Sequence, residues 1–217
     1  MATLPQLPNI VTRFSYQGYN PITKKLKLGA EFLCDVVNQR VFAMNVRFFF
    51  DATFFLPGSP STVNFVDFAP GYGKHSPIVP YFGTGQAGKA YFNLPTTPVT
   101  YVNGAMSIVN INEAPILVST DPTKWTRLFS IELTTKNVLV NSNNYPAVIW
   151  DREPIGTNGS FLTGNAGNVV TVVEDPSGVI KTAPTLVTAL HFNWNAVPTA
   201  TKAPWGSPVM KTPVGVE

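Results

Sequence analysis

The sequence predicts an all-β protein folded as an antiparallel two-sheet sandwich, and three features support this. Apolar and polar residues alternate with a period of two, most clearly over residues 26–36, where every second residue is apolar. The 20 prolines are spread along the 217 residues and exclude long helices. Turn-forming sequences, such as LPGSPS at 56–61 and NSNN at 141–144, separate many short segments, which is typical of a sandwich or barrel.

The expected strands follow in order from this alternation. Residues 26–36 and 41–52 form the clearest pair, and the Asn38-Gln39 dipeptide between them suits a hairpin connection. The other expected strands are short and rich in β-branched or aromatic residues: 10–16, 62–68, 78–82, 89–92, 105–111, 126–134, 147–151, 168–173 and 186–194. We expect one sandwich domain over residues 1–196, followed by a proline-rich extended tail at 197–217.

The composition narrows the class of protein. With 44% hydrophobic and 12% charged residues, the chain has enough apolar area to bury a core. The formal net charge of +3 is spread over single residues, which argues against a nucleic-acid partner. Cys34 is the only cysteine, so no intrachain disulfide forms. No apolar run is long enough to cross a bilayer, so we expect no membrane insertion. Residues 1–8 lack the features of an export signal, but a chain whose signal peptide has been removed would look the same, so both an exported and a non-exported protein fit the sequence.

One segment resembles a nucleotide-binding motif. Residues 83–90, GTGQAGKA, meet the phosphate-loop pattern up to Lys89, but Ala90 stands where the motif needs a magnesium-binding Ser or Thr. The motif also needs a following helix, and Pro95 comes too soon after it. We therefore interpret the segment as a glycine-rich turn between strands.

The sequence lacks the side chains that catalysis needs. His75 and His191 have no nearby second metal ligand, and Cys34 lies on an apolar strand face. Asp151 and Glu153 beside Trp150 could suggest a glycosidase, but no second acidic residue is positioned to face them across a cleft. Calcium would need a loop with alternating acids, which is not found around Asp121, Asp151 or Asp175. We predict no catalytic residue, no cofactor and no metal site.

Aromatic residues in or near loops are the remaining candidates for binding. Tyr72, Tyr81 and Trp205 are the predicted interaction residues, since such rings stack on partner side chains or on sugars. The competing interpretation is ordinary packing, because aromatic residues also dominate sandwich cores. The tail at 197–217 and the loop at 56–74 are the expected contact regions.

A series of motifs runs in order along most of the chain: CDV at 34–36, FAMNVRFFFD at 42–51, FVDF at 65–68, GYG at 71–73, VIWD at 148–151, GNVVTVV at 167–173, FNW at 192–194 and GSPV at 206–209. Together they resemble a cohesin-like, immunoglobulin-type domain of secreted surface proteins of Bacteroidetes bacteria. The resemblance implies a sandwich with jelly-roll-type packing that serves display, adhesion or docking without enzymatic activity. It implies no particular site residues.

Two departures from this family affect the functional prediction. Members usually carry further cysteines and a signal peptide, whereas Glu132 stands here where a cysteine is expected and no export signal is recognised. These departures favour a structural protein displayed on the virion surface of a phage, as a capsid decoration or fibre protein, in a homo-oligomer or a larger assembly with protein partners. The alternative is a secreted or bacterial cell-surface module for adhesion, docking or carbohydrate binding. An enzyme ranks third.

Overall fold

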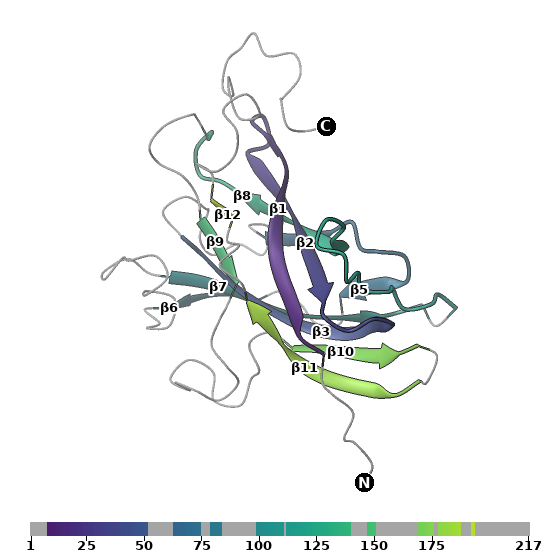
Figure 1. Cartoon of the computed structure of the whole chain (residues 1–217). Coiled ribbons are helices and arrows are strands. Elements are labelled where there is room, and N and C mark those ends of the chain that lie inside the picture. The colour runs from purple at the N-terminus through teal and green to yellow at the C-terminus, as the bar shows by residue number, and fades with distance from the viewer. Residues whose placement is uncertain are drawn as a thin grey trace.

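The computed structural model describes residues 8–51, 63–74, 79–83, 99–110, 112–139, 147–150, 169–175, 178–187 and 192–193. The regular structure in these ranges is entirely β, as Figure 1 shows. The strands are β1 (Ile10–Asn20), β2 (Lys25–Cys34), β3 (Gln39–Asp51), β4 (Val63–Val66), β5 (Tyr72–Lys74), β6 (Val79–Gly83), β7 (Val99–Ile108), β8 (Thr126–Thr134), β9 (Ala147–Trp150), β10 (Val169–Glu174), β11 (Ile180–Val187) and β12 (Phe192–Asn193).

The strands form two antiparallel sheets, which confirms the predicted two-sheet sandwich. Sheet A has the order β1-β2-β8-β4. Sheet B is built on β3, which pairs with β10, β7 and β9, while β5 and β6 add to β7 and β12 adds to β9. Strand β11 connects the sheets, because its first half pairs with β10 and its last residues pair with β1. The β1–β11 pair is parallel, unlike the other pairs between described strands.

The predicted strands agree with the structure to different degrees. Strand β8 has the predicted bounds, whereas β1 continues past residue 16 through a β-bulge and ends at Asn20. The hairpin predicted between 26–36 and 41–52 is wrong, because β2 pairs with β1 and β8 in sheet A whereas β3 pairs with β10, β7 and β9 in sheet B. The turn at 35–38 instead carries the chain from one sheet to the other, and Asn38 takes the left-handed conformation there, with φ of +60°. The strand expected at 105–111 begins earlier, at Val99.

Two strands were missed by the sequence prediction. Strand β5 was predicted as part of a loop at 56–74, but it pairs with β7. Strand β4 in the same segment corresponds to the strand predicted at 62–68, and it pairs with β8. The single strand expected at 186–194 overlaps only the last two residues of β11, which begins at Ile180, and the two residues of β12. Pro184 inside it argues against a strand, yet Pro184 lies where β11 changes partner from β10 to β1. The strand expected at 89–92 and the tail at 197–217 lie outside the described residues.

The core lies between the two sheets and is organised around phenylalanine rings. Phe14 of β1 meets Phe48 of β3 edge-to-face at 5.6 Å between centroids, and Phe48 meets Phe65 of β4 at 6.3 Å. Phe65 in turn contacts Phe129 of β8 at 5.1 Å. Each such pair adds about 0.5–1.5 kcal/mol beyond its buried area, so this series ties the two sheets together. Cys34 is buried in the same core, as predicted.

Candidate functional site

The outer face of sheet A is charged and polar, whereas its inner face is apolar. The alternation that buries Leu26, Leu28 and Phe32 points the residues between them outward. Strand register then aligns Arg13 of β1 with Glu31 of β2 and Arg127 of β8. We call this surface the charged face; its side chains are Arg13, Ser15, Gln17, Lys25, Lys27, Glu31, Asp67, Trp125, Arg127 and Glu132.

Hydrogen bonds join five side chains of the charged face into one network. Glu31 accepts from Arg13 Nε at 2.6 Å and from Ser15 Oγ at 2.8 Å. Gln17 Nε2 donates to Ser15 Oγ at 2.9 Å, and Arg127 Nη1 donates to Gln17 Oε1 at 2.8 Å. Both arginines are therefore held in one orientation, and the side chains are ordered before any partner arrives.

Gly29 of β2 lies beneath this network. A Cβ atom at Gly29 would lie 2.7 Å from Ser15 Oγ, 3.0 Å from Gln17 Nε2 and 3.2 Å from Arg127 Cδ. The contact with Ser15 Oγ is shorter than real Cβ atoms make, so a larger residue would displace Ser15, and the two other tight contacts would require Gln17 and Arg127 to shift by a few tenths of an ångström. Glycine is needed here because of this close approach and not because of its backbone conformation.

Trp125 borders the charged face just before β8. The guanidinium carbon of Arg13 lies 4.2 Å from the centre of the Trp125 ring, which is a cation–π contact. The indole Nε1 donates to the carbonyl of Pro122 at 3.0 Å, which fixes the ring. Arginine and tryptophan are the residue types most enriched among those that dominate protein–protein binding energy.

The carboxylates of the charged face are each paired with a cation. Glu31 pairs with Arg13 at 2.6 Å and Glu132 pairs with Lys25 at 3.0 Å. Asp67 pairs with Lys27. The side chains involved are partly exposed, so each pair contributes little stability, about 0–1 kcal/mol. Their main effect is to hold charges of both signs at defined places on the surface.

A groove opens at one end of the charged face. It has a volume of about 240 Å³ and is lined by Gln17, Gly18, Tyr19, Asn20, Thr23, Lys25, Lys27 and Glu132. Gln17 belongs to both the groove and the hydrogen-bonded network, so the two features are continuous. Pockets for small organic ligands usually measure about 300–1,000 Å³, which makes this groove better suited to a side chain of a partner.

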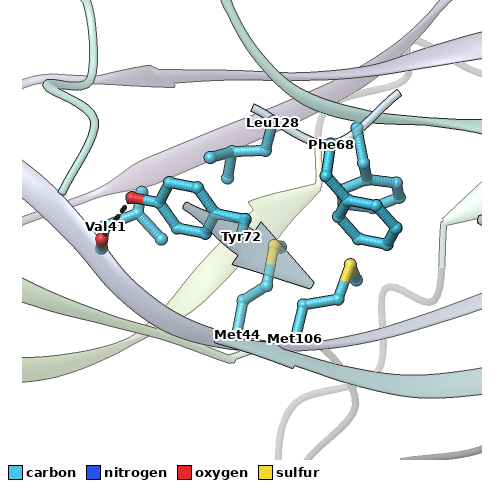
Figure 2. A pocket seen from close by; sticks show the side chains of 7 residues that line it. Val41, Met44, Phe68, Tyr72, Met106 and Leu128 are labelled. Atoms are coloured by element: carbon cyan, nitrogen blue, oxygen red, sulfur yellow. Dashed lines mark hydrogen bonds between the residues drawn. The ribbon is translucent and has the colours of Figure 1, made fainter. Parts of the chain in front are cut away.

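Tyr72, a predicted interaction residue, lies between the sheets, and its hydroxyl is hydrogen-bonded to two backbone groups of this chain. It donates to the carbonyl of Val41 at 2.6 Å and accepts from the backbone N–H of Ile116 at 2.7 Å, and burial raises its pKa. Figure 2 shows its ring beside Met44 and the bond to Val41. The cavity here measures about 10 Å³, room for about one water molecule, and is lined by Val41, Met44, Phe68, Tyr72, Met106, Leu128 and Phe129. It is a packing gap rather than a ligand site.

The other predicted residues are placed only in part. Tyr81 lies in β6, opposite Tyr101 of β7 in the strand register. Trp205 lies outside the described residues, as do His75, His191, the acidic pair Asp151 and Glu153, and most of the 83–90 motif. The interaction roles of Tyr72, Tyr81 and Trp205 stay predictions.

Two of the aspartates weighed for calcium have local partners. Asp121 accepts from the N–H and the hydroxyl of Thr123, which lowers its pKa, and Asp175 pairs with Arg40 at 3.1 Å. Across the described ranges, no three His, Cys, Asp or Glu residues group as a metal site would require. Over the same ranges, no helix has the length and hydropathy to span a membrane.

The sequence prediction missed the charged face as a site. The alternation over 26–36 does place Lys27, Gly29 and Glu31 on a polar face, and that was the available signal. Arg13 and Arg127 are distant from them in sequence and join them only through strand register. Loop aromatics were favoured instead, because exposed rings are visible in a sequence and cross-strand neighbours are not.

Comparison with known proteins gives loose structural similarities. No protein-family model and no curated protein matches the sequence. Similar solved chains include the sixth cohesin of Acetivibrio cellulolyticus scaffoldin B, in complex with a mutant Cel5 dockerin (6% identity, TM-score 0.39, 84% of this chain and 95% of that chain). A second is a chain of a complex between CaCohA2 and a variant of CaDoc0917 (10% identity, TM-score 0.36, 85% of this chain and 97% of that chain). A third is a cohesin module of a Clostridium perfringens family 33 glycoside hydrolase (8% identity, TM-score 0.27, 84% of this chain and 97% of that chain). The sandwich itself is defined by the strand pairing described above.

Proposed function

We propose that this chain is a non-enzymatic module that docks a partner protein on the charged face. The observation that carries the proposal is the network of Arg13, Glu31, Ser15, Gln17 and Arg127, which is already ordered in the unbound chain. Binding usually costs about 0.5–1.5 kcal/mol for each long side chain that it immobilises. A face whose side chains are ordered in advance avoids part of that cost.

The chemistry of the face supports a protein partner over other classes. Positive and negative side chains alternate on it, so it lacks the uniformly basic surface that nucleic acid requires. Its groove of about 240 Å³ is smaller than usual small-ligand pockets. A mixed polar surface bordered by Trp125 matches the polar composition and aromatic anchors of protein interfaces.

The substitution Gly29→Ala tests this proposal without removing any charge. The new methyl group displaces Ser15, to which Glu31 and Gln17 are hydrogen-bonded, and crowds Gln17 and Arg127, while the strand backbone tolerates alanine. Gly73→Ala in β5 is the matched control, since the three atoms nearest to its Cβ would all belong to Val109, a side chain that is 59% exposed and lies outside the charged face. We expect both variants to fold with melting curves close to that of the wild type.

The assay compares proteins captured from virion and cell-surface fractions by the immobilised wild type and by each variant. Partners held by the wild type and by Gly73→Ala, but lost or weakened about tenfold by Gly29→Ala, support docking on the charged face. Equal capture by all three proteins contradicts it. The melting curves show whether a variant that no longer captures partners has also lost its folded structure.

The place where the module is displayed stays a prediction. A virion surface, as capsid decoration or fibre, and a secreted or bacterial cell-surface position both require a docking face of this kind. Light scattering behind a sizing column, with and without virions, separates them. A defined homo-oligomer or co-elution with particles supports the virion, whereas a monomer retained on cell-surface protein or polysaccharide supports the adhesion or docking alternative.

A further inference from the structure

We propose that Arg127 determines the specificity of the charged face by binding a carboxylate group of the partner protein. This inference rests on the proposed function and names the chemistry that the face recognises. Arg127 lies in β8 and is exposed to solvent. Its position next to the Arg13–Glu31 pair follows from the register of three adjacent strands.

The charge balance of the face points to Arg127. Each of its three carboxylates already pairs with another cation, as described above. Arg127 is the fourth cation, and no carboxylate among the described residues pairs with it. The two charges within each ion pair therefore cancel, and the one positive charge that is left lies on the Arg127 guanidinium.

The geometry of Arg127 leaves its donors available. A guanidinium has five N–H donors, and one of them, on Nη1, is used by Gln17 Oε1 at 2.8 Å. That bond fixes the orientation of the planar group, and Arg127 Cδ lies over Gly29. A held guanidinium with free donors suits two parallel hydrogen bonds to one carboxylate, the geometry in which Arg binds most selectively.

The neighbours of Arg127 favour a carboxylate over a phosphate. A phosphate group carries about 1.5–2 negative charges, and it would lie close to Glu31, whose strand position is paired with that of Arg127. A carboxylate carries one negative charge, which balances the single charge left on the face. Trp125, two residues before Arg127 on the same side of the strand, can cover the apolar stem of an Asp or Glu.

A random peptide library displayed on phage tests the inference with a defined probe. Selection on the wild type, followed by counter-selection on Arg127→Gln, isolates peptides that depend on Arg127. We expect these peptides to share an Asp or Glu, and we expect its replacement by Asn or Gln to weaken binding about tenfold or more. The same peptide change should have no further effect on Arg127→Gln, which defines the pair by a double-mutant cycle.

Two further variants separate the guanidinium from its charge. Lys74→Gln removes one exposed positive charge from sheet B and should leave the peptides bound. Arg127→Lys keeps the charge but loses the planar fork, so it should recover only part of the affinity. Full recovery by lysine would contradict the proposed fork geometry.

The outcomes distinguish this inference from the proposed function. The peptides selected on the wild type are therefore also tested before counter-selection: if those lost on Gly29→Ala are retained on Arg127→Gln, or if the counter-selected peptides lack acidic residues, the role of Arg127 is overturned and docking on the charged face stands. A selection with no peptide sensitive to Gly29→Ala counts against the charged face itself, and with it against both proposals.

Discussion

Tyr72 offers the most direct test of how the structure uses a residue that the sequence marked for binding. Its hydroxyl bonds to Val41 and Ile116, two backbone groups that lie on different segments. Tyr72→Phe removes both bonds and keeps the ring, so the packing around the cavity is unchanged. The variant therefore isolates the contribution of the two hydrogen bonds.

The expected loss follows from the number of bonds. Each neutral hydrogen bond contributes about 0.5–1.5 kcal/mol net, so the two together give about 1–3 kcal/mol. For a chain of this size, that corresponds to a melting temperature lower by roughly 2–12 °C. The loss is a sizeable part of a typical unfolding free energy of about 5–15 kcal/mol.

Urea unfolding followed by tryptophan fluorescence measures this loss, and the capture assay measures binding by the same variant. Ile22→Ala is the control for stability, because Ile22 is 90% exposed in the β1–β2 turn and should change the unfolding free energy by less than about 0.5 kcal/mol. A Tyr72→Phe protein as stable as the wild type would refute the structural role. Unchanged stability with lost partner capture would instead support the predicted interaction role.

Two further predictions concern the core and its tyrosines. Phe129 packs against three other phenylalanine rings, so Phe129→Ala should cost about 3–5 kcal/mol in urea unfolding, and a loss no larger than that of Ile22→Ala would contradict the packing. Burial raises the pKa of Tyr16, Tyr19 and Tyr72, so their contribution to stability is complete below the unfolded value of about 10 and is lost as pH rises through the higher folded values. Tyrosinate absorbance during alkaline titration should therefore rise in two steps, the second coinciding with unfolding; a single step near pH 10 with the fold intact would contradict this.

The strands were predictable where the signal is local. Period-two alternation found β2 because one side of that strand is buried, and burial selects apolar residues at alternate positions. Strand β8, which has four consecutive buried residues, was found from its β-branched and aromatic residues. Strand β5, with only three residues, is too short to show such a pattern, and it is held by pairing with β7. Strand β11 was not predicted because it contains Pro184, and a proline inside a segment argues against a strand. The sequence does not show that β11 changes partner from β10 to β1 at this residue, which is where a proline can be accommodated.

The sequence by itself determined the β class, the apolar inner face of β2 and the polar character of its outer face, because these depend on residues two apart in the same strand. Only the tertiary structure decided that Arg13, Glu31 and Arg127 share one surface, since strand register brings together residues far apart in the chain. The same holds for Gly29, whose importance comes from side chains of two neighbouring strands crossing over it. The pattern of residues along one strand therefore cannot predict a network whose side chains come from several strands.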